Sequence, residues 1–197
     1  RAIHAMVTLA KSDRSVARHP DDFDNDQWLC AVKNGTLDLR TGQLRPHSPA
    51  DLITFLAPVA YDPGATCPVW QRFVSEVFDG DKDMVAFIQR AIGWSLSGAV
   101  KERALFFLYG DTGKNGKTTL VEVIMKLVGI CGESSYGYGR KVGADTFMKS
   151  KNQDDNQRKA ATLAGPRFVC TSEVAERRNP ILSASRIAIS ETSGRSR

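Results

Sequence analysis

The segment Ala104-Leu-Phe-Phe-Leu-Tyr-Gly-Asp-Thr-Gly-Lys-Asn-Gly-Lys-Thr-Thr119 is the most informative stretch of this sequence. It begins with an apolar run, continues through a glycine-rich loop and enters a segment with helical periodicity. An apolar run without alternation is typical of a strand that is covered on both faces. The order of strand, glycine-rich loop and helix predicts a phosphate-binding P-loop.

The chemistry expected of such a loop centres on Gly116-Lys117-Thr118. Backbone N–H groups surround the phosphates, the lysine reaches the β- and γ-phosphate oxygens, and the threonine hydroxyl binds Mg²⁺. The helix that follows directs the positive end of its dipole at the anion. We therefore predict an ATP and Mg²⁺ site, with Lys117 catalytic and Thr118 a metal ligand. The predicted nucleotide-binding residues are Gly110, Asp111, Thr112, Gly113, Lys114, Asn115, Gly116, Lys117, Thr118 and Thr119.

The spacing of this loop departs from the usual motif. Four residues normally separate the first glycine from the Gly-Lys pair, whereas five lie between Gly110 and Gly116. Read strictly, the first position is Asp111, and either Gly113 supplies the flexibility or the loop bulges by one residue. The alternative is a glycine-rich turn that binds nothing, which the flanking strand and helix disfavour.

A helical stripe follows the loop and stops at Gly129, a plausible helix end. Glu122 and Lys126 lie four residues apart on its polar side and can pair. The apolar positions predicted to face the core are Leu120, Val123, Ile124, Leu127 and Val128.

A second buried strand is predicted over 167–171, and it leads into Ser172-Glu173. P-loop ATPases place an acid at the carboxyl end of such a strand, beside the metal. Glu173 can hold a metal-bound water or accept a proton from the attacking one. We predict that Glu173 is catalytic and a metal ligand, with Glu176 as the substitute. A surface glutamate after a strand is the alternative.

The segments before the P-loop predict a small α+β region. A helix is expected over 2–17, and a hairpin over 28–39 around Asn34-Gly35, the strongest short hairpin signal. A second turn at Thr41-Gly42 precedes a strand, and 59–61 is a candidate short strand.

Two helices with apolar stripes are predicted over the next stretch. The first starts near Pro68, which suits a first helical position, and Asp79-Gly80-Asp81 separates it from the second. Gly98 closes this helical region. Aromatic residues in such stripes are expected in the core rather than at a cofactor.

The segment 132–156 is polar and glycine-rich and interleaves aromatic with cationic residues. Such a segment can stack on and neutralise a single strand of nucleic acid, and a mobile surface loop is an equal alternative. Outside this segment, helices are expected over 157–164 and 181–189. The interleaved residues are Tyr136, Tyr138, Arg140, Lys141, Lys149 and Lys151.

Bulk properties are ordinary for a globular protein. The 197 residues carry a net charge of +5, which is compatible with nucleic acid without indicating it. The four cysteines form no C-x-x-C pair and the three histidines have no ligand spacing, so no metal or disulfide framework is predicted. No apolar run reaches membrane-spanning length. We expect a reduced, intracellular compartment and no membrane partner. The start at Arg1, inside a predicted helix, suggests a piece of a longer protein.

These motifs together resemble the carboxyl-terminal part of phage- and plasmid-encoded primase–helicases of the superfamily-three type. The resemblance runs from about Ala2 to Glu173, and its segment before the P-loop resembles the poxvirus-like domain that precedes this helicase module. Asn115 directly before Gly-Lys and Ser172-Glu173 after the second strand are specific features. The other segments that carry it are 34–42, 59–63, 67–68, 87–98, 108–110 and 167–171.

The resemblance implies an α/β fold: a P-loop nucleotide-binding domain of AAA+-like type over 100–197, preceded by an α+β domain over 1–99. It implies an ATP-dependent DNA helicase that moves on single-stranded DNA as a homo-oligomer, usually a hexameric ring. Asn115 would shape the loop. An upstream primase domain and a cytoplasmic location in a bacterial host, encoded by a phage or prophage, are also implied.

One part of the family pattern is not found. The family continues past the acidic strand with a Lys…Leu-Thr-Gly-Gly-Asp segment, a DNA-contacting hairpin and an arginine finger, whereas 185–194 reads differently here. We therefore expect an incomplete P-loop domain with inefficient hydrolysis, because a trans arginine contributes about 10³–10⁵ in rate in comparable systems. The alternatives are a non-catalytic nucleotide-binding or assembly module and another P-loop enzyme such as a small-molecule kinase.

Overall fold

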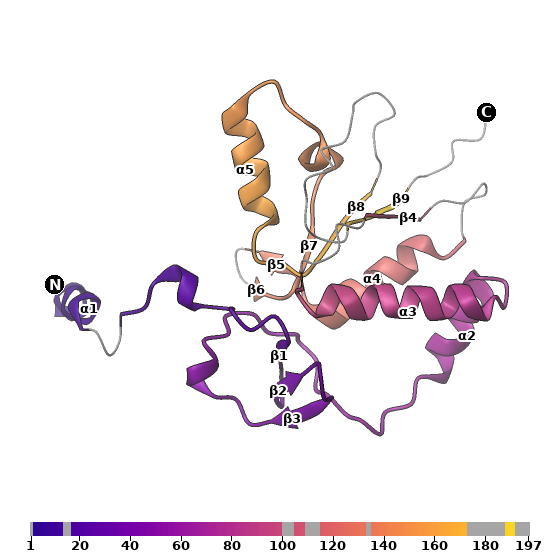
Figure 1. Ribbon diagram of the computed structural model, residues 1–197, viewed down its shortest axis with the longest axis horizontal. Coiled ribbons are helices and arrows are strands. Elements are labelled where there is room, and N and C mark those ends of the chain that lie inside the picture. The colour runs from indigo at the N-terminus through magenta and orange to yellow at the C-terminus, as the bar shows by residue number, and fades with distance from the viewer. Residues whose placement is uncertain are drawn as a thin grey trace.

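The computed structural model describes residues 2–13, 17–99, 105–108, 115–132, 135–172 and 188–191. Within these residues the chain is a mixed α/β protein with small sheets. An antiparallel sheet comes first along the chain, and a parallel sheet with helices alongside it comes second (Figure 1).

The antiparallel sheet has the order β1-β2-β3, formed by β1 (Leu29–Val32), β2 (Gly35–Asp38) and β3 (Gln43–Arg45). The predicted hairpin is confirmed, but its turn lies one residue earlier than the Asn34-Gly35 signal indicates, because Val32 pairs with Gly35. A Cβ on Gly35 would collide with the carbonyl oxygen of Arg45 in β3. Glycine is therefore needed at this position for the close approach of β3.

The predicted strand over 59–61 is wrong. This segment forms no strand, and the nearby Ala57 makes an isolated parallel bridge with Val32. The side chain of Asn34 instead holds the segment. Its amide nitrogen donates to the carbonyl of Tyr61 at 2.8 Å, and its oxygen accepts from the Tyr61 N–H at 2.8 Å. The side-chain amide of Asn34 thus makes the backbone hydrogen bonds that a neighbouring strand would otherwise make.

Three α-helices precede the parallel sheet in the described part of the chain. The first, α1 (Ala2–Ser12), ends before Ala17, the expected limit. The two predicted helices with apolar stripes are confirmed as α2 (Pro68–Val77) and α3 (Lys82–Leu96). Asp81 caps the N-terminus of α3, because its carboxylate accepts hydrogen bonds from the N–H groups of Asp83 and Met84. This cap explains why α3 starts directly after Asp79-Gly80-Asp81.

The parallel sheet has the order β4-β9-β8-β7. Its strands are β4 (Phe106–Leu108), β7 (Gly139–Lys141), β8 (Phe168–Ser172) and β9 (Ala188–Glu191). The strand expected near 167–171 is confirmed as β8. The helix expected over 181–189 is wrong at 188–189, which lie in β9, and 181–187 lie outside the described residues.

The described residues of the segment expected to be a surface loop or a nucleic-acid contact contain regular structure. The segment contains the short strands β5 (Cys131–Gly132) and β6 (Ser135–Tyr136), then β7, which joins the parallel sheet. The helix α5 (Gln153–Leu163), the last among the described residues, begins four residues before the expected start because Asn152 caps it.

The helix α4 (Lys117–Val128) packs across β7, β8 and β9 and ends before Gly129 as predicted. Its buried face differs from the predicted stripe. Val121 and Met125 are buried, whereas Val123 and Leu127 are 40% and 47% exposed. The predicted core positions Leu120, Ile124 and Val128 are buried.

One hydrophobic core joins the two predicted domains. Its buried members come from both sides of residue 99, including Val32 in β1, Val74 in α2, Ile124 in α4 and Phe168 in β8. The boundary at residue 99 stays a prediction, but the described residues on either side of it fold around common packing.

Candidate functional site

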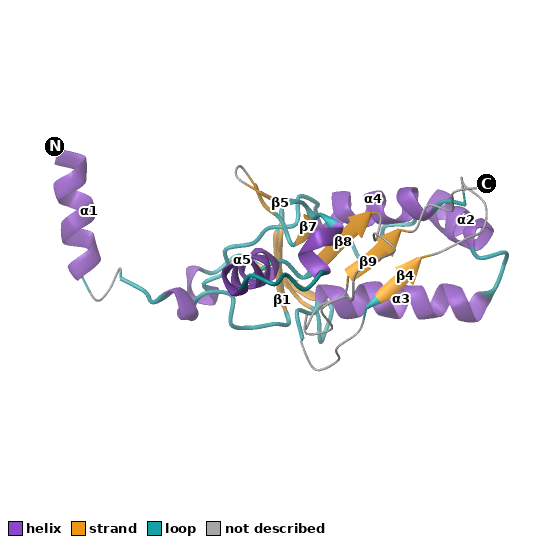
Figure 2. Cartoon of the chain, turned by 90° about the horizontal axis from the view of Figure 1, so that it is seen from above, coloured by secondary structure: helices purple, strands orange, loops and turns teal. Residues whose placement is uncertain are grey.

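The helix α4 begins at the predicted phosphate-binding motif. Gly116 is its N-terminal cap, with a left-handed φ of 79°, and Lys117 is its first helical residue. The strand β4 ends at Leu108, so the chain passes from a parallel strand to the start of a helix, as predicted. Figure 2 shows α3 and α4 running alongside the parallel strands. Residues 109–114 lie outside the described part of the chain.

The backbone at Gly116 is held by α2. A Cβ on Gly116 would lie 2.5 Å from Cγ2 of Val77 and 3.3 Å from the ring of Phe73. Any residue other than glycine would therefore meet both an unfavourable φ and a steric clash. These two side chains leave no room for a side chain at the turn that starts α4.

The side chain of Lys117 folds back on the loop. Its Nζ donates to Oδ1 of Asn115 at 2.5 Å. This contact gives Asn115 a physical role in the loop, because it orients the ammonium group near the start of α4. Thr118 and Thr119 are exposed on the first turn of the helix.

The N-terminus of α4 receives no hydrogen bond from the side chain of its cap residue, since Gly116 has none to offer. The starts of α3 and α5 differ, because Asp81 and Asn152 cap them. The first turn of a helix presents unpaired N–H donors and the positive end of the helix dipole. Together with Lys117, this end of α4 is suited to an anion.

The strand β8 ends at the same edge of the sheet as β4. Leu108 pairs with Glu191 and Glu191 pairs with Ser172, so the three residues lie in one row. The segments that follow Leu108 and Ser172 therefore leave the sheet at the same edge, with β9 between them. In open α/β sheets, ligands bind at this carboxyl edge.

The structure describes only some of the predicted site residues. Asn115, Gly116, Lys117, Thr118 and Thr119 are brought together at the start of α4. The remaining predicted residues lie outside the described residues: Gly110, Asp111, Thr112, Gly113, Lys114 and Glu173, with the substitute Glu176.

The sequence interpretation missed the role of α2 at this site. Phe73 was expected in the core, which is consistent with its partial burial, but nothing in its spacing indicated contact with Gly116. A stripe of apolar residues shows which face of a helix is buried. The element that covers this face depends on the topology.

The aromatic and cationic residues of 132–156 do not form one surface. Tyr136 is 67% exposed, whereas Tyr138 is 1% exposed and cannot stack on a nucleobase. Arg140 donates to the carbonyl of Thr162 and to Sγ of Cys131, the latter at 3.0 Å. The prediction that Tyr138 contacts nucleic acid is therefore wrong, because its side chain points into the core.

A shallow, open depression of about 550 Å³ with mixed polar and apolar walls adjoins Arg140 and Lys141. It is lined by Cys131, Gly132, Arg140, Lys141, Val142, Gly143, Thr146 and Thr162.

In the described part of the chain, no group of three or more His, Cys, Asp or Glu side chains is placed to hold a metal ion. No helix among the described residues is both long and apolar enough to cross a lipid bilayer.

Two comparisons bear on this arrangement. Residues 1–79 match a family model described as "D5 N terminal like". The chain is also similar to a protein of Acanthamoeba polyphaga mimivirus that is named as a putative helicase. The two are 28% identical over 112 residues, which cover 55% of this chain and 12% of the viral protein. The chain thus spans a small part of the length of this relative.

One match is thus to a D5 N-terminal-like family model and the other to a viral protein named as a helicase. The first match covers α1, the antiparallel sheet and α2, and ends before α3. It therefore includes Phe73 and Val77, the α2 residues that pack against the start of α4.

Proposed function

We propose that this chain provides the ATP-binding part of a DNA helicase of the phage primase–helicase type. The observation that carries the proposal is the start of α4, where Gly116 adopts a left-handed conformation and Lys117 opens the helix. This start lies after a parallel strand, as a phosphate-binding loop requires. The similarity to a mimivirus protein named as a putative helicase supports the same class.

In this proposal Lys117 neutralises the β- and γ-phosphates, and the N–H groups at the start of α4 bind their oxygens. Thr118 and Glu173 hold Mg²⁺, which supplies charge neutralisation when it is bound. The register that places Leu108 and Ser172 in one row supports this assignment, because Glu173 directly follows Ser172. Movement on single-stranded DNA and assembly into a ring are proposed for the whole protein.

The test is calorimetric titration of the chain with ATPγS and Mg²⁺. Lys117→Ala should weaken binding by about 10- to 100-fold, because a charged hydrogen bond contributes roughly 1.5–3 kcal/mol. Lys126→Ala is the matched control, since it removes the same charge from the last turn of the same helix. Its affinity should stay near that of the parent chain.

Equal weakening by both lysine substitutions would show that overall charge, rather than the loop, controls binding. Absence of binding by the parent chain would overturn the proposal and favour a non-catalytic assembly module. Steady-state ATPase measurements with and without single-stranded DNA should be run beside the titration. A small-molecule kinase would instead require an acceptor other than water.

Glu173→Gln tests the metal assignment. If Glu173 helps to hold Mg²⁺, the substitution should reduce the gain in ATPγS affinity that Mg²⁺ provides. Affinity measured in EDTA should be the same for the variant and the parent chain. An unchanged gain from Mg²⁺ would exclude Glu173 from the metal site and direct attention to Glu176.

A further inference from the structure

The helix α1 presents an apolar face that the rest of the described chain does not cover. Ile3, Met6 and Leu9 are 79%, 68% and 70% exposed, and Val7 is 48% exposed. Ile3, Met6, Val7 and Ala10 have the i, i+3, i+4, i+7 spacing of anchors in a helix that binds a groove. The described residues of the chain leave this face of α1 exposed, so it is available to a partner surface.

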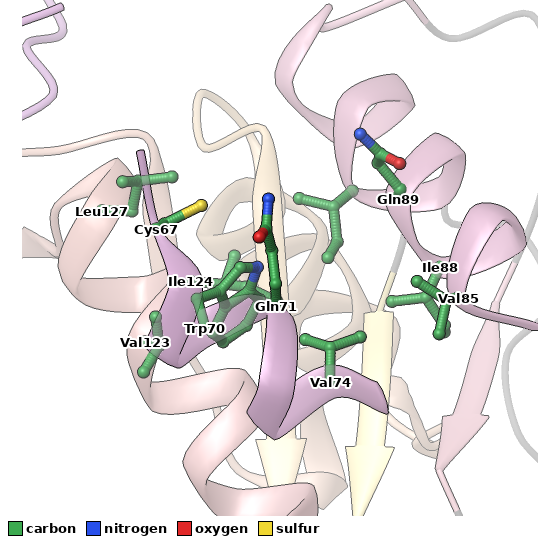
Figure 3. Close-up of a pocket in the computed structure, with 11 residues that line it drawn as sticks. Cys67, Trp70, Gln71, Val74, Val85, Ile88, Gln89, Val123, Ile124 and Leu127 are labelled. Atoms are coloured by element: carbon green, nitrogen blue, oxygen red, sulfur yellow. The ribbon is translucent and has the colours of Figure 1, made fainter. Parts of the chain in front are cut away.

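An apolar cavity of about 610 Å³ opens between α2, α3 and α4. Figure 3 shows its lining, with Trp70 and Val74 from α2, Ile88 from α3, and Val123 and Leu127 from α4. The volume corresponds to roughly twenty water-sized volumes, enough for several aliphatic side chains. The polar side chains in the lining are Cys67, Gln71 and Gln89.

This cavity explains why the predicted stripe of α4 is only partly buried. Val123 and Leu127 lie on the stripe but remain 40% and 47% exposed, because they face the cavity rather than the sheet. Together with the other lining side chains, they form an apolar groove with no cover from the described residues. We call it the three-helix groove.

The charges beside the groove complement those of α1. The helix α1 contains no acidic residue and carries Lys11 in its last turn. The turn between α2 and α3 carries the exposed Asp79 and Asp81, and the first turn of α3 carries the exposed Lys82 and Asp83. Three carboxylates against one ammonium leave this turn acidic, a few residues along the chain from the groove residues Val74 and Val85. Opposite charges of this kind fix the direction in which a helix docks.

We propose that the three-helix groove binds α1 of a second copy of this chain. Figures 1 and 2 place α1 at one end of the long axis and α2 at the other, so the groove is remote from α1 of the same chain. The apolar face of α1 would lie on Trp70, Ile88 and Leu127, with Lys11 toward the acidic turn. Such a contact joins two different surfaces and generates a ring or an open chain of subunits.

The proposal is independent of nucleotide, so it is tested with the chain alone. Analytical ultracentrifugation over a concentration series should show reversible association, with a dissociation constant between about 1 µM and 1 mM. Leu9→Asp should raise this constant at least about tenfold, because it places a charge in the apolar contact. Thr8→Asp adds the same charge on the opposite face of α1 and should leave association unchanged.

A second pair of variants tests the groove. Leu127→Lys should weaken association as strongly as Leu9→Asp, whereas Glu122→Lys alters α4 outside the groove lining and should have little effect. Each disruptive variant retains one intact surface. A mixture of Leu9→Asp and Leu127→Lys chains should therefore form a one-to-one dimer that grows no further.

The exposed thiol of Cys67 in the groove lining distinguishes the two possible sources of α1. The variant Met6→Cys, oxidised under mild conditions, should yield a disulfide-linked ladder of dimers and larger species on a non-reducing gel. Cys67→Ser in the same background should abolish the ladder. A cross-linked monomer would overturn the proposal by showing that α1 occupies the groove of its own chain. Association that both charge variants leave unchanged would overturn it as well.

Discussion

The guanidinium carbon of Arg167 lies 4.7 Å from the centre of the Tyr138 ring, and this pair joins three distant parts of the chain. Arg167 donates to the carbonyls of Leu29 in β1 and Leu96 at the end of α3, at 2.8 and 2.9 Å. The hydroxyl of Tyr138 accepts the N–H of Ala31 at 2.8 Å. The pair therefore anchors β1 and α3 to the parallel sheet.

The first prediction concerns the hydroxyl of Tyr138, which also donates to the carbonyl of Phe55 at 3.2 Å. Burial raises the pKa of this hydroxyl above its ordinary value, so it stays protonated and able to donate even in mildly alkaline solution. Tyr138→Phe leaves the Ala31 N–H and the Phe55 carbonyl without this partner. We expect the free energy of unfolding to fall by about 1–3 kcal/mol in a urea titration.

Tyr136→Phe is the control for this substitution. It removes the same atom from a ring that is 67% exposed, and it should change stability by less than about 0.5 kcal/mol. Equal losses for the two variants would contradict the role assigned to Tyr138.

The second prediction separates the geometry of Arg167 from its charge. Arg167→Lys keeps the charge, but one ammonium cannot replace a planar fork that reaches two carbonyls in different elements. We expect a loss of about 1.5–3 kcal/mol on unfolding in urea. Arg90→Lys, at an exposed position on α3, should be near neutral. Full stability of Arg167→Lys would show that charge alone suffices.

Local signals predicted much of the fold. Pro68, the Asp79-Gly80-Asp81 break and Gly129 each act within a few residues, and the structure has helix boundaries at all three. The start of α4 at Lys117 likewise follows from Gly116 and the periodicity after it. Signals of this kind need no knowledge of the rest of the chain.

The long-range contacts could not be predicted in the same way. Arg167 and Tyr138 bind partners up to 138 residues away in the sequence, and no spacing reveals such pairs. The stripe of α4 indicated an apolar face but could not show that Val123 and Leu127 border a groove. The contact of Phe73 with Gly116 at the candidate site belongs to the same group.

The third prediction compares one substitution at two glycines. Gly116→Ala should destabilise the chain by about 1–3 kcal/mol, because it combines a positive φ with a clash against Val77. Gly93→Ala should stabilise it by about 0.5–1 kcal/mol, because Gly93 lies within α3 and its Cβ would meet nothing within 4 Å. Thermal unfolding of both variants measures whether their stabilities change in these opposite directions.

A second substitution separates the steric contribution to the stability loss of Gly116→Ala from the contribution of its positive φ. Val77→Ala in the Gly116→Ala background should restore part of the lost stability, since it removes the methyl group that clashes. The same double variant should recover part of any loss in ATPγS affinity. A double variant with the summed defects of the two single variants would show that Val77 does not constrain Gly116.

The fourth prediction concerns the ion pair that joins β3 to the segment after it. The two Arg45 nitrogens Nη1 and Nη2 lie 2.8 and 2.7 Å from the carboxylate oxygens of Asp51. Hydrogen bonding from Arg45 lowers the pKa of Asp51 below its ordinary value. The folded state therefore binds this proton less readily than the unfolded state. The resulting stability is present above the ordinary aspartate pKa of about 3.9 and is lost as the pH falls through the lowered folded value.

Urea unfolding of the parent chain and of Asp51→Asn at several pH values tests this linkage. The parent should be the more stable at pH 7, and the difference should shrink below about pH 4, where the carboxylate of the unfolded chain is already protonated. Asp62→Asn is the control, because Asp62 is exposed and its side chain accepts only the Gly64 N–H among the contacts described. A difference between the parent and Asp51→Asn that stays constant down to pH 2 would mean that the substitution acts through packing rather than through the charge of Asp51.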